Sequence, residues 1–216
     1  MRANEQPATI NFMNVTLRGE NSHFWAYLLW VLSFVIVVAS GINGGLKEIL
    51  FSLPVVAFLS FVGWVGWWNP RLIVLPQGIH VINLAREYFI PWADVSEALN
   101  RWGLYIYTKS GKKIPVWVLP SRVGLLYNSW RERKRSLPDP IDWKDPQPRE
   151  IVVPLPFAAD SLNIRTHAIR SDSALRRRLA LTGEKWDETT TSRFLPLPIA
   201  GTLVLLSSAV ATLVLI

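Results

Sequence analysis

The hydrophobic positions of the chain gather into three long stretches without a charged residue, at residues 24–42, 49–68 and 194–216. Each stretch is long enough for a helix that crosses a hydrocarbon core of roughly 30 Å, at about 1.5 Å per residue. We therefore predict three transmembrane helices. The alternative for any one of them is a helix buried in the core of a soluble protein.

A break at Asn43-Gly44-Gly45 separates the first two stretches and predicts a helical hairpin. Aromatic residues gather at the start of the first stretch and at the end of the second, namely Trp25, Tyr27, Trp30, Trp64, Trp67 and Trp68. In a hairpin both groups lie at the same membrane interface, where amphipathic rings are favoured. The pattern thus predicts that the two groups meet.

Between residues 72 and 119 the pattern changes to short β-branched and aromatic runs separated by glycine-containing turns. Such runs are typical of an antiparallel meander. We expect five strands, with the polar segment 93–100 as a connection between the third and the fourth. This is the part of the chain that reads as a compact folded unit with its own core.

Three motifs in this region resemble the bacterial pleckstrin-homology-like (PH-like) domain: Gly78-Ile79-His80-Val81, Tyr88-Phe89-Ile90-Pro91-Trp92-Ala93-Asp94-Val95 and Ser110-Gly111-Lys112. The resemblance implies a small half-open barrel closed by a helix, no catalytic activity, and a membrane-anchored protein of the actinobacterial type. An unrelated meander is the alternative. The expected fold class is an α+β membrane protein, with three transmembrane helices and a cytoplasmic antiparallel PH-like meander or half-barrel closed by a helix.

Helix and proline patterns divide the remainder of the chain. Ser121 can cap a helix that ends before Pro138, and this would be the closing helix of the PH-like fold. Prolines between residues 137 and 157 favour an extended arm that carries Trp143. Residues 160–169 are ambiguous between helix and strand, and a short helix is expected at 173–182. The expected divisions are a tail (1–23), the hairpin (24–68), the PH-like domain (69–136), the arm with its short helix (137–193) and the last membrane helix (194–216).

Charge adds a prediction of orientation. The net charge is +7, and Arg18, Arg71 and Arg193 border the apolar stretches, whereas the loop inside the hairpin carries Lys47. Under the positive-inside rule, the three arginines place the amino terminus and the PH-like domain in the cytoplasm and the carboxyl terminus outside. The expected location is the bacterial plasma membrane, crossed several times.

The chemistry that the sequence offers argues against a catalytic or metal-binding role. The chain has no cysteine, and its three histidines, His23, His80 and His167, lie in different segments without carboxylates at ligand spacing. No glycine-rich phosphate loop follows a strand. We expect no enzyme activity, no metal and no cofactor.

Two functions remain open. The first is a non-enzymatic accessory subunit that braces the cytoplasmic face of a larger membrane complex, such as a respiratory supercomplex, with Trp143 on the arm as a contact. The alternative is a sensor of anionic lipid headgroups; nucleic acid is not an expected partner. Candidate contacts for lipid or partner are the basic residues Arg131, Arg133, Lys134, Arg135, Arg176, Arg177 and Arg178. A helix-packing face is expected from Gly201, Ser208 and Thr212.

Overall fold

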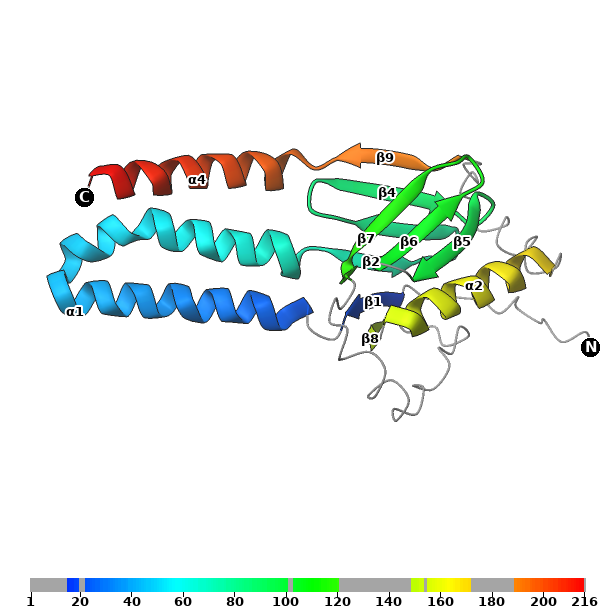
Figure 1. Cartoon of the computed structure of the whole chain (residues 1–216), viewed down its shortest axis with the longest axis horizontal. Helices are drawn as coiled ribbons and strands as arrows, with labels where there is room; N and C mark the ends of the chain where they lie inside the picture. The colour runs from blue at the N-terminus through cyan, green and yellow to red at the C-terminus, as the bar shows by residue number, and fades with distance from the viewer. Residues whose placement is uncertain are drawn as a thin grey trace, which may run out of the picture.

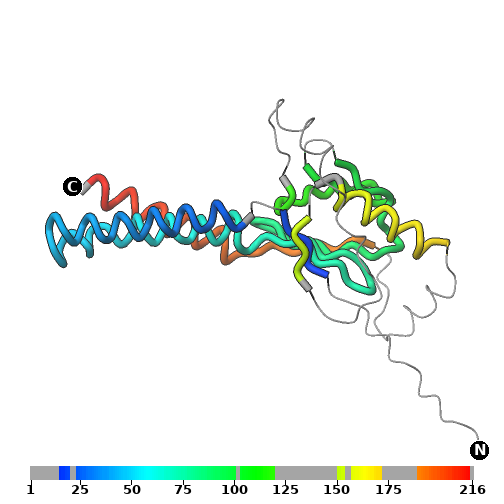
Figure 2. The backbone as a smooth tube through the Cα atoms, turned by 90° about the horizontal axis from the view of Figure 1, so that it is seen from below, coloured from blue at the N-terminus to red at the C-terminus, as the bar shows by residue number. Residues whose placement is uncertain are grey.

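The computed structural model describes residues 15–19, 22–100, 103–120, 149–153, 155–171 and 189–215. Apolar helices extend from one end of a β-rich body, so the molecule is elongated (Figures 1 and 2). The elements, in chain order, are β1 (Val15–Gly19), α1 (Ser22–Gly63), η1 (Trp64–Trp68), β2 (Arg71–Val74), β3 (Gly78–Ile82), β4 (Arg86–Pro91), β5 (Val95–Asn100), β6 (Gly103–Thr108), β7 (Lys113–Pro120), β8 (Arg149–Val153), α2 (Leu155–Ser171), β9 (Thr191–Phe194) and α4 (Pro196–Leu215).

Helix α1 folds back on itself at Gly45, whose backbone angles are φ 63° and ψ −148°. A positive φ favours glycine because glycine has no Cβ atom. The two arms run beside each other in Figure 1 and overlap in the perpendicular view of Figure 2, so they are adjacent along their length. Each arm, at 22–44 and at 46–68 with η1 included, is about 33 Å long at 1.5 Å per residue.

Polar bonds join the two arms of α1. The Trp30 indole Nε1 donates to the Ser60 carbonyl oxygen at 3.1 Å, and the Ser60 hydroxyl donates to the Ser33 hydroxyl at 3.1 Å. Ser33 is buried although it lies on an apolar helix. Such bonds between helices are useful in lipid, where no water competes for the donors.

Two helical elements are long and apolar enough to cross a membrane, His23–Trp68 and Pro196–Val214. The expectation of three separate spanning helices is therefore corrected to two helical elements, of which the first bends back on itself at Gly45. The reason is that the turn near Gly45 takes up a single non-helical residue, so the first two apolar stretches form one bent helix. Most exposed large hydrophobic side chains of the described residues lie on these two elements.

The β-rich body contains a six-stranded sheet with the order β8-β1-β2-β3-β4-β9 and a three-stranded antiparallel sheet with the order β5-β6-β7. β1 pairs with β8 in parallel, whereas the other pairs in the larger sheet are antiparallel. The fold is thus α+β with a mixed sheet. The prediction of a single five-strand meander was wrong in two respects: the polar segment contains β5, and the chain changes sheets between β4 and β5.

The change of sheet occurs at a tight turn that is anchored in the core. The Asp94 amide donates to the Pro91 carbonyl at 2.9 Å and thereby closes the turn. Trp92 is buried, and its indole Nε1 donates to the Leu75 carbonyl at 3.1 Å. A large ring with its single donor satisfied is well suited to the space between two sheets.

Helix α2 packs against β5 and β6 of the smaller sheet (Figure 1). The Asn163 side chain binds both the amide and the carbonyl of Ala98, at 2.7 and 2.8 Å, and Leu162 is fully buried. The segment 160–169 is therefore helical. The helices predicted at 121–137 and 173–182 lie outside the described residues, so the predicted closing helix has no structural counterpart to compare.

Two strands arise from segments predicted as tail and arm. β1 comes from the segment 1–23 and lies inside the larger sheet, with Val15 and Leu17 fully buried. β8 comes from the proline-rich segment and pairs with β1, so that Leu17 lies opposite Ile151. The folded body therefore extends beyond the predicted limits of 69–136.

Candidate functional site at the helix–sheet junction

The aromatic residues at the base of α1 make ring contacts across its two arms. His23, Tyr27 and Trp30 on the first arm contact the Trp68 ring, with centroid distances of 4.6, 5.9 and 5.2 Å. Trp25 lies 6.5 Å from Trp67. The two aromatic groups of the predicted hairpin thus meet in the structure, and they mark the end of α1 that faces the β-rich body.

A tryptophan from the sheet joins this end of the helix. The Trp117 indole on β7 donates to the Gly66 carbonyl at 2.8 Å, although the residue is 48% exposed. Gly66 belongs to η1, a π-helical turn in which the Asn69 amide bonds to the Trp64 carbonyl at 2.8 Å. The bond from Trp117 ties the smaller sheet directly to the end of α1.

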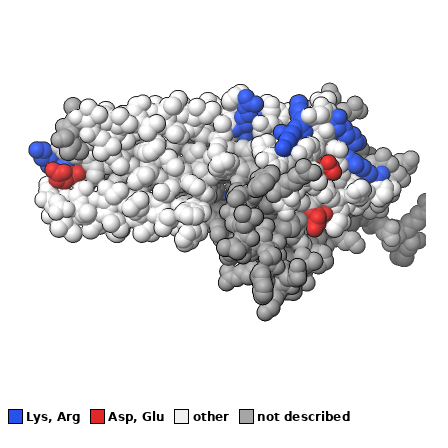
Figure 3. Space-filling view, in the orientation of Figure 1, with Lys and Arg blue, Asp and Glu red and all other residues white. Residues whose placement is uncertain are grey.

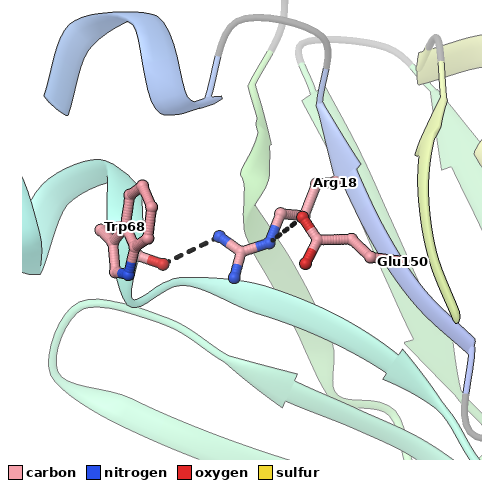
Figure 4. Close-up of polar contacts among 3 residues, drawn as sticks. All are labelled: Arg18, Trp68 and Glu150. Carbon is pink, nitrogen blue, oxygen red and sulfur yellow. Dashed lines mark hydrogen bonds and ion pairs between the residues drawn. The ribbon is translucent and has the colours of Figure 1, made fainter. Parts of the chain in front are cut away.

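Arg18 on β1 makes a second tie between sheet and helix (Figure 4). Its Nη1 donates to the Trp68 carbonyl at 2.8 Å, and its Nε lies 2.8 Å from Oε1 of Glu150 on β8. Arg18 is 7% exposed, and burial lowers the pKa of its guanidinium while Glu150 opposes that shift. A buried charge with a carboxylate beside it and a carbonyl in reach is stable only in a fixed geometry. Arg18 therefore fixes the relative position of β1, β8 and α1.

The other two flanking arginines lie at the surface. Arg71 is exposed, and the Arg193 side chain is 83% exposed. On the face drawn in Figure 3, charged side chains lie on the β-rich body and at the far tip of the helices, where Lys47 and Glu48 are located, and the helices between are uncharged. The charge pattern matches a slab of apolar surface between two polar ends.

An open groove of about 230 Å³ lies where the helices reach the larger sheet. It is lined by Trp64, Asn69, Arg71, Ile82, Glu87, Leu195, Pro196, Leu197 and Pro198. The Glu87 carboxylate lies 3.6 Å from His80 Nε2 and 4.0 Å from Arg193 Nε. The groove thus combines one guanidinium, one carboxylate and one amide with apolar walls.

Asp94 forms a buried polar node at the opposite side of the body. Its carboxylate accepts bonds from the amide and hydroxyl of Ser110 and from the amide and hydroxyl of Thr190. Burial raises the pKa of Asp94, but these donors outweigh burial and hold the pKa below its usual value. The Lys112 ammonium donates to the Thr190 carbonyl at 2.9 Å. The node fastens the segment that leads into β9.

The structure describes only part of the predicted site residues. Arg131, Arg133, Lys134, Arg135, Trp143, Arg176, Arg177 and Arg178 lie outside the described residues. Gly201 lies against Phe61 of α1, since a Cβ atom at Gly201 would be 2.5 Å from the ring. Ser208 and Thr212 are half-buried, and their hydroxyls donate to carbonyls of their own helix, Leu205 and Ser208 respectively, at 2.9 Å.

Sequence reasoning missed the residues that connect the sheet to the helices. Arg18 and Glu150 are far apart in the chain, and Arg18 appears in sequence only as a charge before an apolar stretch. The one available indication was the alternation Val15-Thr16-Leu17-Arg18, which is consistent with a short strand. Its partner strand could not be identified by that means.

Within the described part of the chain, no group of three or more His, Cys, Asp or Glu residues could hold a metal ion. Comparison of the chain with protein-family models, with curated proteins and with solved structures found no match.

Proposed function

We propose that this chain is a membrane-integrated, non-enzymatic interaction subunit that holds its β-rich body in a fixed orientation against one face of a bilayer. The single observation that carries the proposal is the stiff connection between helices and sheets. One or two residues separate β1 from α1, η1 from β2, and β9 from α4. Arg18 and Trp117 add bonds across the same boundary.

A stiff connection is informative because a domain that only needs tethering can hang on a flexible linker. Three short connections together remove most of the rotation of the body relative to the helices. A surface held in one orientation at a fixed distance from the bilayer suits contact with another membrane-bound protein. The proposed partner is a larger bacterial membrane complex, such as a respiratory supercomplex.

The apolar helices support the membrane part of the proposal. Each arm of α1 is about as long as a bilayer core is thick, and α4 packs beside α1 through Gly201 and Phe61. We place the tip of α1 outside the cell and the β-rich body in the cytoplasm, because Arg71, Arg86 and Arg193 all lie at the body end. The PH-like resemblance of the body is part of the same proposal.

Purification of the tagged full chain from native membranes in a mild detergent tests the proposal. We expect partner proteins at a constant ratio to the chain, and we expect Trp143→Ala to reduce their recovery. A matched control is Tyr107→Phe, which keeps a ring at a described position on β6, outside the arm and away from the helix–sheet boundary. A chain that elutes alone after gentle extraction, with and without cross-linking, would contradict the proposal.

Sensing of anionic lipid is the second candidate, and the exposed lysines and arginines of the β-rich body favour it (Figure 3). Each cation near an anionic surface adds roughly 1 kcal/mol. The test reconstitutes the full chain in vesicles with and without anionic lipid and measures how fast a protease cleaves it. If the chain senses anionic lipid, the cleavage rate should differ between the two kinds of vesicle. Reversal of the charges at Arg133, Lys134 and Arg135 should then abolish the difference.

A further inference from the structure

The groove at the helix–sheet junction lies at the depth of lipid headgroups if the apolar helices span a bilayer. Trp64 begins η1 directly after α1, and Pro196, Leu197 and Pro198 begin α4, so both helices meet the groove where their apolar surface stops. Leu197 is 67% exposed and continues the groove wall onto the lipid-facing surface. A ligand of this groove can therefore have a polar part at the sheet and an apolar part along α4.

The polar groups of the groove are available for a ligand. Among the described residues, the Arg71 guanidinium and the side-chain amide of Asn69 make no hydrogen bond or ion pair, whereas the backbone amide of Asn69 bonds to Trp64. Among the described residues, the ion-pair contacts of the Glu87 carboxylate are His80 Nε2 at 3.6 Å and Arg193 Nε at 4.0 Å, both longer than the roughly 2.7–2.9 Å of a strong charge-assisted bond. Arg18, by contrast, is buried and contacts the Trp68 carbonyl and the Glu150 carboxylate. Arg71 is thus a free cation among the described residues of this junction, and Glu87 retains acceptor capacity.

We propose that this groove binds a glycerophospholipid whose headgroup carries a phosphate and a primary ammonium, as in phosphatidylethanolamine. In this proposal the phosphate accepts hydrogen bonds from the Arg71 guanidinium and the Asn69 side-chain amide, and the ammonium donates to the Glu87 carboxylate. The acyl chains run beside Leu197 along α4. This inference rests on the membrane integration in the proposed function, and it adds a specific lipid site to it.

Charge and size select this class of headgroup. A purely anionic headgroup has no cation to pair with the Glu87 carboxylate. A trimethylammonium group has no N–H to donate to that carboxylate. A volume of 230 Å³ is below the roughly 300–1,000 Å³ of sites for drug-sized ligands, so it suits a headgroup whose chains remain in the bilayer.

The test uses the full chain in nanodiscs with equal amounts of phosphatidylethanolamine, phosphatidylcholine and phosphatidylglycerol of matched acyl chains. Native mass spectrometry then counts the lipids that stay bound after mild extraction. We expect phosphatidylethanolamine to be retained over the other two. Arg71→Gln should lower its retention about tenfold, as expected for one charge-assisted bond. Glu87→Gln should remove the preference over phosphatidylcholine.

Lys109→Gln is the matched control, because it removes an exposed cation from the β6–β7 turn, away from the groove. Equal retention of the three lipids by the wild-type chain, or unchanged retention by Arg71→Gln, would overturn the inference. Thermal unfolding of each variant shows whether it is folded, and the lipid preference of the wild-type chain does not depend on any variant. If the chain purifies without partner proteins but still prefers phosphatidylethanolamine, only the proposed function is contradicted. If partner proteins co-purify but the three lipids are retained equally, only the lipid site is contradicted.

Discussion

At the scale of single residues, two buried charged groups hold the molecule together in different ways. Arg18 bridges β1, β8 and the end of α1, so it couples the sheet to the helices. Asp94 gathers donors from Ser110 and Thr190 and fastens the strand that leads to α4. Neither residue was among the contact residues predicted from the sequence, since a buried charge is identified by its partners and not by its neighbours in the chain.

Replacement of Arg18 by methionine should destabilise the body. Methionine keeps an apolar stem but leaves Glu150 without its partner and the Trp68 carbonyl without its donor. We expect a loss of about 1–3 kcal/mol of unfolding free energy, below the value for a fully buried pair because the Glu150 side chain is 44% exposed. Thermal unfolding followed by tryptophan fluorescence measures it. Lys109→Met should shift the midpoint little, and equal effects of the two variants would contradict the role of Arg18.

Asp94 predicts a dependence of stability on pH. Its pKa is lower in the folded chain than in the unfolded chain, where it is about 3.9. The stabilising contribution is therefore complete above that value and disappears as the pH falls through the folded pKa. Asp94→Asn should lower the free energy of unfolding by about 1–3 kcal/mol at pH 7. The difference in unfolding free energy between wild type and variant should become smaller below about pH 4. Asp160→Asn, at an exposed position on α2, is the control. A difference in unfolding free energy that stays constant with pH would show that the ionised Asp94 carboxylate is not the cause of the stabilisation.

At the scale of elements, long periodic segments could be predicted and short ones could not. The apolar stretches, the glycine break and most strands between residues 72 and 119 follow from the sequence pattern. β5 was missed because both Ser96 and Glu97 are exposed, and a register shift between Val95 and Glu97 breaks the alternation. β1 and β8 were missed because each is five residues long and they pair across a large separation in sequence.

The packing face of α4 could be anticipated only in part. Gly201 follows the general preference for small residues where membrane helices approach, and in the structure it lies against Phe61. Ser208 and Thr212 use their hydroxyls within α4, as serine and threonine often do in apolar helices. The sequence gives the spacing of small residues, but the identity of the facing side chain comes from the fold.

Gly201→Leu should weaken the contact between α4 and α1. A Cβ atom at this position would be 2.5 Å from Phe61, so a leucine side chain must displace the ring. Overpacking of this kind costs about 1–3 kcal/mol. Thermal unfolding in nanodiscs measures the loss, and Phe61→Ala in the same chain should restore part of it because the two sites share one space. Independent, additive effects of the two substitutions would show that the residues do not contact each other.

At the scale of the whole molecule, one arrangement connects the observations. Two apolar helical elements, one of them bent at Gly45, run from a mixed-sheet body to a tip that bears Lys47 and Glu48 (Figures 1 and 3). Aromatic rings, buried Arg18 and the groove all lie at the boundary between them. In a bilayer, that boundary would lie at one surface and the tip at the other.

The most direct test of this arrangement is the accessibility of the two ends. The chain has no cysteine, so Glu48→Cys and Lys109→Cys each introduce a single thiol, at the tip and in the β6–β7 turn. A maleimide that cannot cross membranes should label Glu48→Cys in intact cells and should label Lys109→Cys only after the membrane is opened. Labelling of both positions from the same side would contradict a chain that spans the bilayer between its tip and its β-rich body.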